Sequence, residues 1–317
     1  KINNFSKILH MNKKLLVALA AVSLLFTILP SSKAEEVNPG TLAIIDTAIN
    51  TNLPEIKNNI VYEVCILDWQ SCPNKTQYQE GSGSASMPLD QIMKNGFAHG
   101  TSMTYSAVSA NPDVKVVFVR VVGATSTGAR QFTDEYTFNH ALMWIYFNKD
   151  RLNIKAVAMS QGHHSLLKSS NYCPSTPLTA NIINELFIAN IPVFLPSGND
   201  YDLNRISWPA CIPTSVAVSS SADGNVPSSF TNYDAKLTDI FARGDLKVLY
   251  PNGMYFNESG SSISTQIAAA SYMALANKYP MYTATQLLDL LKTKTKPLLS
   301  KKIKNALVID SKAVLNG

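Results

Sequence analysis

The feature that most constrains the fold is an alternation of short apolar runs with amphipathic segments between residues 41 and 219. Continuously apolar runs bounded by turns are typical of strands buried on both faces, as in parallel sheets. Strands that alternate with helices indicate a doubly wound α/β fold with a mainly parallel central sheet, and no domain boundary interrupts the pattern. The expected strands are 41–45, 60–67, 114–119, 154–159, 191–195 and 216–219, and the expected helices are 131–147, 176–190, 267–276 and 283–294.

The first 34 residues have the pattern of a secretory signal that begins at Met11, after ten upstream residues. Lys13 and Lys14 precede an apolar run over 15–29, and small residues at Ser32 and Ala34 favour cleavage after Ala34. The alternative, a membrane anchor, needs about 20 apolar residues. We therefore expect a mature domain over 35–317, secreted or periplasmic, with no membrane partner after cleavage and a bacterial type of export.

Charge excludes one class of partner. The signal segment holds five lysines and no acidic residue, so 22 basic and 22 acidic side chains remain after its removal. The mature chain is then close to neutral, and it contains no basic run interleaved with aromatic residues. We expect no nucleic-acid binding.

All four cysteines lie in the predicted mature chain. An even number in an exported protein predicts two disulfides, and of the three pairings we favour Cys65 with Cys72 and Cys173 with Cys211. Zinc ligation is the alternative, but the chain has no Cys-x-x-Cys pair and no Cys/His cluster of suitable spacing. We predict no metal site from these residues.

Three polar residues stand where chemistry is favoured, although each has an ordinary structural alternative. Asp46 follows the first strand, at the sheet edge where ligands of α/β folds collect, but an Asp there also suits a turn. His99 lies among small residues at a helix start, where a lone His is more often structural. Ser262 precedes an alanine-rich helix, where a serine often serves as the N-cap.

Together these residues meet the requirements of acyl transfer. They supply a nucleophile in Ser262, a base in His99 and a carboxylate in Asp46 that can orient the base, and Asn199 adds an amide donor for an oxyanion. The helix start at Ser262 also offers unpaired N–H groups and a positive dipole end.

In this order and setting, the chain resembles the subtilisin-like serine proteases over nearly all of residues 41–317. Ile44–Ile49 resembles the family's aspartate motif and His99–Thr101 its histidine motif. Ser197–Asp200 resembles the segment with the oxyanion asparagine, and Ser259–Thr265 resembles the nucleophile motif. Met159–Gly162 matches the strand that pairs with substrate, and Trp208–Val218 matches the stretch after the asparagine.

The resemblance implies a three-layer sandwich and an Asp46-His99-Ser262 triad, with Asn199 and the Ser262 N–H binding the oxyanion. It implies an extended polypeptide substrate that lies between two segments and pairs with them by strand addition. We expect no required cofactor and a monomer; the resemblance allows structural calcium, for which the sequence assigns no ligand. The substrate-binding residues are Ser160, Gln161, Gly162, Pro196, Ser197 and Gly198.

The sequence departs from the family pattern near these motifs. Gln266 stands where the family usually has a proline, Ala48 replaces a glycine, and Ser102–Thr104 replaces a His-Val-Ala pattern. Only residues 35–40 separate the predicted signal from the first strand, so we expect no inhibitory pro-domain.

The expected function is therefore a secreted serine endopeptidase. A catalytically degenerate, peptide-binding family member is one alternative, favoured by Gln266 and the missing pro-domain. An esterase that uses the same triad is another, whereas an α/β-hydrolase is disfavoured because no Gly-x-Ser-x-Gly motif is present.

Overall fold

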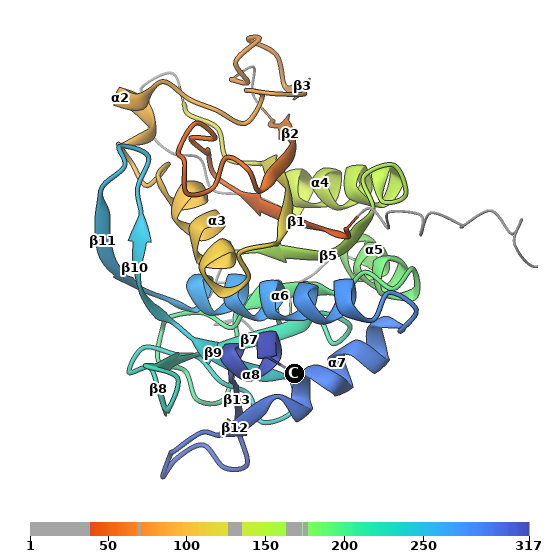
Figure 1. Ribbon diagram of the computed structural model, residues 1–317, viewed down its shortest axis with the longest axis vertical. Coiled ribbons are helices and arrows are strands. Elements are labelled where there is room, and N and C mark those ends of the chain that lie inside the picture. Colours follow the sequence, from red (N-terminus) through yellow and green to blue (C-terminus); the bar gives the residue numbers. More distant parts are fainter. Residues whose placement is uncertain (1–38, 69–70, 126–134, 163–172, 174–176, 317) are drawn as a thin grey trace, which may run out of the picture. The chain divides into compact units, whose positions relative to one another are not determined.

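A computed structural model describes residues 39–68, 71–125, 135–162, 173 and 177–316. These residues belong to one compact unit that begins at Pro39 (Figure 1). The predicted signal, residues 1–34, lies outside the described residues, so its assignment stays a prediction. In the described part of the chain, no helix combines the length and the apolar character that a membrane span requires.

The described strands form a mainly parallel, 11-stranded sheet in the order β12-β13-β9-β7-β6-β5-β1-β4-β2-β3, with β8 paired to β7. The pairs β2/β3, β12/β13 and β7/β8 are antiparallel, and the seven pairs from β13 to β2 are parallel. The strands of this sheet are β1 (Thr41–Asp46), β2 (Ile60–Ile66), β3 (Tyr78–Glu80), β4 (Lys115–Arg120), β5 (Ile154–Met159), β6 (Val193–Pro196), β7 (Val216–Ala222), β8 (Val226–Pro227), β9 (Ile240–Arg243), β12 (Thr295–Pro297) and β13 (Leu307–Ile309).

Helices cover both faces of this sheet and give the predicted three layers. One helical layer packs on one face of the sheet and consists of α3 (His99–Ala110), α6 (Ser261–Lys278), α7 (Ala284–Thr293) and α8 (Ser311–Asn316). The layer on the opposite face consists of α2 (Leu89–Ile92), α4 (Glu135–Asn148) and α5 (Pro177–Ile188). The predicted doubly wound α/β fold is confirmed.

The central strands divide their side chains between these two cores. In β1, Leu42 and Ile44 pack in the core of α3 and α6, whereas Ala43 and Ile45 pack in the core of α4 and α5. Successive side chains of a strand point to opposite faces, so a strand covered on both sides must be apolar at every position. This is why the sequence shows a continuous apolar run here and no alternation.

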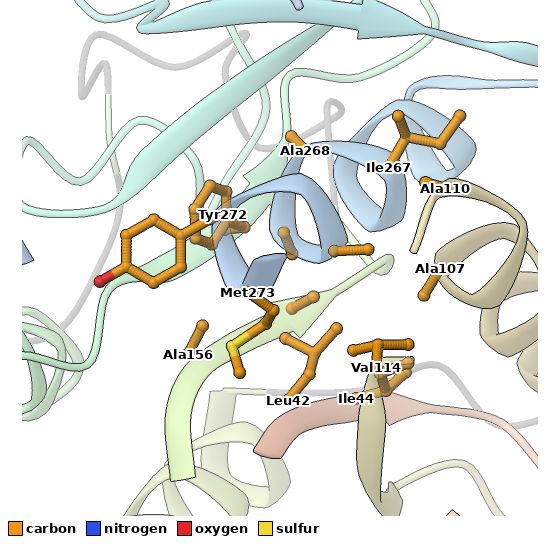
Figure 2. Packing of buried hydrophobic residues seen from close by; sticks show 14 of the residues in the cluster. Leu42, Ile44, Ala107, Ala110, Val114, Ala156, Ile267, Ala268, Tyr272 and Met273 are labelled. Atoms are coloured by element: carbon orange, nitrogen blue, oxygen red, sulfur yellow. The ribbon is translucent and has the colours of Figure 1, made fainter. Parts of the chain in front are cut away.

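Helix α6 crosses the middle of the sheet and is buried along most of its length. Ala268, Ala269 and Ala270 are fully buried, and their small side chains allow α6 to approach both the strands and α3 closely. Figure 2 shows Met273 of α6 between Ala156 of β5 and Leu42 of β1. The helix begins at Ser261, several residues earlier than the apolar run suggested, because the polar serines that open it are themselves buried.

Several strands escape prediction because they lack a continuous apolar run. A separate two-stranded hairpin joins β10 (Asp245–Leu249) to β11 (Tyr255–Ser259), and every residue of β11 is exposed. Strands β3, β8 and β12 have two or three residues each, too short for a recognisable period. Near the C-terminus, β13 pairs in parallel with β9.

Both favoured disulfides are present. Cys65 bonds to Cys72 and closes the loop after β2, and Cys173 bonds to Cys211. The structure therefore confirms the predicted pairing, and neither pair of cysteines is available as metal ligands.

Candidate active site

Asp46 is the last residue of β1 and is completely buried. Its Oδ1 accepts hydrogen bonds from the Thr47 N–H at 2.6 Å and from the His99 ring, whose Nδ1 lies 2.8 Å away. Within the described residues, its Oδ2 is buried without a hydrogen-bond partner. A buried carboxylate that receives an imidazole N–H fixes the orientation and the tautomer of the ring.

Thr47 holds the start of α3, and with it His99, against the end of β1. Its hydroxyl donates to the Phe97 carbonyl at 2.8 Å and accepts the Gly100 N–H at 2.8 Å. Gly100 makes the close approach feasible, because a Cβ there would lie 2.5 Å from the Ala48 carbonyl oxygen. The His99 side chain, at the first position of the helix, stays 27% exposed.

Ser262 occupies the second position of α6, and Gly260 is the N-cap. The alternative that Ser262 serves as the N-cap of this helix is therefore wrong. Its hydroxyl donates to the Ser160 carbonyl at 3.2 Å, and the Ser160 hydroxyl donates to the Ser262 carbonyl at 3.1 Å. These two bonds join the start of α6 to the residue that follows β5.

Gln266, the departure from the family's proline, belongs to the same group of contacts. It is fully buried one turn after Ser262, and its Nε2 donates to the Ser160 hydroxyl at 2.9 Å. Its Oε1 is buried without a hydrogen-bond partner in the described part of the chain. A proline could not make this side-chain contact, so the substitution adds a link between α6 and Ser160.

Asn199 faces the start of α6. Its Oδ1 accepts the Ser261 N–H at 2.9 Å, which leaves its Nδ2 as the donor end. A Cβ built on Gly260 would lie 3.6 Å from Asn199 Nδ2 and 3.8 Å from the Ser262 nitrogen. The two predicted oxyanion donors therefore flank one small space, which stays open because residue 260 is a glycine.

The two predicted substrate-binding segments leave the sheet at neighbouring strand ends. Ser160–Gly162 follows β5, and Pro196–Gly198 spans the end of β6, which pairs in parallel with β5. Asn232 supports the second segment, since its carbonyl accepts the Ser197 hydroxyl at 2.9 Å and its Oδ1 accepts the Asp200 N–H at 2.8 Å. Sequence reasoning missed Asn232, which lies in an irregular loop with no recognisable motif.

One cleft of about 340 Å³ brings three of the predicted residues together: His99, Asn199 and Ser262 line it, and Asp46 lies buried behind His99. Sequence reasoning missed two other lining residues, Tyr250 and Glu258, whose hydroxyl and carboxylate are 2.6 Å apart. No local signal marks them, because they meet only where the β10–β11 hairpin closes.

Burial, together with the hydrogen bond to Glu258 and the charge of that carboxylate, raises the pKa of Tyr250 to about 12. At neutral pH the phenol is therefore protonated and donates its hydrogen bond to the Glu258 carboxylate at the wall of the cleft.

No group of three His, Cys, Asp or Glu side chains in the described ranges is arranged to hold a metal ion. The arrangement at the cleft offers an oriented imidazole, a serine hydroxyl and two N–H donors, which are the groups that acyl transfer needs.

Comparison with known proteins agrees with this geometry. The model of the Subtilase family, peptidase family S8, matches residues 40–309. The alkaline protease of Alkalihalobacillus alcalophilus is 24% identical over 242 residues, which are 73% of this chain and 58% of that protein. Subtilisin BL of Lederbergia lenta is also 24% identical over 242 residues, which are 73% of this chain and 82% of that protein.

Solved structures share the fold. A protease from Pseudoalteromonas arctica superposes with a TM-score of 0.69 at 18% identity, covering 87% of this chain and 89% of its own. A cold adapted subtilisin-like serine proteinase superposes with a TM-score of 0.59 at 19% identity, and the match covers 86% of this chain and 88% of that chain. The family match and the shared fold lead to one conclusion: the chain belongs to the subtilase family and is homologous to the bacterial subtilisins.

Proposed function

We propose that this protein is a secreted serine endopeptidase in which Asp46, His99 and Ser262 form the catalytic triad. The observation that carries the proposal is the 2.8 Å contact between Asp46 Oδ1 and His99 Nδ1, made behind a cleft that His99 shares with Ser262 and Asn199. Membership of a protease family supports a polypeptide substrate.

In the proposed reaction, Ser262 Oγ attacks the scissile carbonyl carbon while His99 Nε2 takes the hydroxyl proton. His99 then returns this proton to the leaving amine, and water releases the acyl group from Ser262 by the same steps. Before the attack, the hydroxyl turns from the Ser160 carbonyl toward His99 by rotation about the Ser262 Cα–Cβ bond. Asp46 keeps Nδ1 protonated and stabilises the imidazolium.

Asn199 Nδ2 and the Ser262 N–H would bind the oxyanion of the tetrahedral intermediate. Both nitrogens lie within 4 Å of the point that a Cβ on Gly260 would occupy, which supports this role, and the start of α6 adds its positive dipole end. Loss of one such donor costs about 10²–10³ in kcat in comparable enzymes.

The acyl side of the substrate would lie extended between Ser160–Gly162 and Pro196–Gly198, which end adjacent parallel strands. Backbone hydrogen bonds would supply most of the recognition on this side. Two disulfides support an oxidising compartment, in line with the predicted secretory signal.

Reaction with a fluorophosphonate probe tests the triad directly, because the probe modifies only an activated serine. We expect labelling of wild type, none of Ser262→Ala and almost none of His99→Ala, whereas Ser109→Ala, an exposed serine on α3, labels like wild type. Circular dichroism confirms that each variant is folded.

Hydrolysis of an unfolded protein substrate then identifies the reaction. Fragments that appear with wild type and not with Ser262→Ala support the endopeptidase. Turnover of small esters without any cut protein would favour an esterase, and a folded wild type that neither labels nor cuts would favour a peptide-binding protein.

A further inference from the structure

The cleft lies on the leaving-group side of Ser262. Ser160–Gly162 and Pro196–Gly198, which are proposed to bind the acyl side, contribute no lining residue to it. Much of its wall comes instead from the start of α3 with the segment just before it, and from the β10–β11 hairpin, which runs beside α3 (Figure 1). Because His99 faces this cleft and protonates the leaving amine in the proposed reaction, the released part of the peptide occupies it.

The hairpin wall is fixed to α3. The Ser102 hydroxyl, in the first turn of α3, donates to the Leu249 carbonyl at the end of β10 at 3.0 Å. The Asn50 side chain donates to the Pro251 carbonyl at 2.7 Å. The wall therefore has a defined position relative to His99, although β11 itself is exposed.

Glu258 supplies a negative charge to this wall. The Tyr250 hydroxyl donates to one of its oxygens at 2.6 Å and so orients the carboxylate. Its other oxygen has no hydrogen-bond or ion-pair partner in the described part of the chain. Among the described residues that line the cleft, the ionisable ones are Glu258, His99 and Tyr250, and none is a lysine or an arginine.

The rest of the lining suits an aliphatic chain. Met93 and Met103 line the cleft together with Ala98 and Ile263. Thioether side chains are flexible and adapt to the shape of an apolar partner. Lysine and arginine bury their aliphatic stems along such surfaces while they keep the charged end at a polar group. The combination of methionine walls and an available carboxylate matches these two side chains.

We propose that Glu258 makes the enzyme select substrates with lysine or arginine immediately after the scissile bond. This inference rests on the proposed function, since it requires Ser262 and His99 to release that part of the peptide. Glu258 acts on binding of the leaving residue and takes no part in bond cleavage.

The test measures kcat/KM on peptides that differ only in the residue after the scissile bond: lysine, norleucine or glutamate. Norleucine matches the lysine stem without the charge. For wild type we expect lysine to exceed norleucine by about 2- to 5-fold, the range of a partly exposed ion pair, and the ratio to shrink in high salt. In Glu258→Gln the ratio should fall to about one, and in Glu258→Lys glutamate should become the favoured residue. Glu55→Gln, an exposed carboxylate outside the cleft, should keep the wild-type ratio.

A p-nitroanilide substrate separates this inference from the proposed function, because its leaving group has no side chain. If wild type hydrolyses the anilide but shows equal lysine and norleucine rates, the Glu258 inference is wrong while the protease assignment stands. If the lysine preference is present and survives in both Glu258 variants, another group provides it and the inference is also wrong. If wild type hydrolyses no substrate, the proposed function fails and this inference fails with it.

Discussion

Replacement of Gln266 by methionine should separate the stability of the fold from the precision of the site. The side chain is fully buried, donates to the Ser160 hydroxyl at 2.9 Å and leaves its own Oε1 without a partner among the described residues. Methionine keeps the length and shape but removes both polar atoms. The lost hydrogen bond costs about 0.5–1.5 kcal/mol, whereas the removal of an unsatisfied buried acceptor returns about 1–3 kcal/mol. We therefore expect the free energy of unfolding of Gln266→Met to lie between about 0.5 kcal/mol below and about 2.5 kcal/mol above that of wild type.

Activity should move the other way. Gln266 fixes Ser160, whose carbonyl accepts the Ser262 hydroxyl and whose own hydroxyl donates to the Ser262 carbonyl. Without the amide, Ser160 and the start of α6 are less firmly held together, and small misplacements of reacting groups are costly. We expect kcat to fall by about 3- to 30-fold, with a smaller change in KM.

The assay combines urea unfolding, followed by tryptophan fluorescence, with steady-state kinetics on one peptide. Ser160→Ala removes the hydroxyl that receives the Gln266 bond, so the double variant should lose less kcat than the two single effects combined. A free energy of unfolding more than about 2 kcal/mol below wild type, together with unchanged kcat, would refute the reasoning, since the amide would then serve stability and not positioning.

Three further predictions concern particular contacts. Gly260→Ala should fold normally, because the φ of 169° at this residue is extended and the new methyl group would lie 3.6 Å from Asn199 Nδ2. The methyl group should nevertheless lower kcat/KM by about 10²–10³, because it fills the space between the two oxyanion donors. A normal melting temperature with wild-type kinetics would contradict this. Gly100→Ala should lower the free energy of unfolding by about 1–3 kcal/mol, since the new Cβ would lie 2.5 Å from the Ala48 carbonyl oxygen, and calorimetry that shows no loss would disprove the clash. Because the pKa of Tyr250 is raised to about 12, the folded state keeps the phenol proton at pH values at which the unfolded state loses it. The contribution of this group to stability is therefore present below about pH 10 and declines as the pH rises toward 12. Tyr250→Phe should flatten that decline in melting temperature, and an unchanged pH profile would show that the phenol is not coupled to folding.

The sequence alone was sufficient for the central strands and the fold class, and the disulfide pairing that it favoured among three agrees with the structure. Strands covered on both faces must be apolar at every position, so β1 and β5 are visible as continuous runs, and β5 matches its predicted range of 154–159. The candidates Asp46, His99 and Ser262 could be named because each stands in a short motif at the edge of a predicted element. The hairpin of β10 and β11 was not predictable in the same way, since β11 is exposed throughout, β10 is fully buried only at Val248 and Leu249, and neither strand carries a continuous apolar run.

Only the tertiary structure decided how these residues act on one another. The contact of Gln266 with Ser160 spans 106 positions, and sequence reasoning could note the glutamine as a departure but not find its partner. Thr47 and Glu258 likewise owe their roles to contacts with residues on other elements. Local patterns record which residues must be buried and where a strand or helix ends, because those requirements act on neighbouring positions. A hydrogen bond between distant side chains leaves no such record, since it depends on how the sheet brings separate strand ends together.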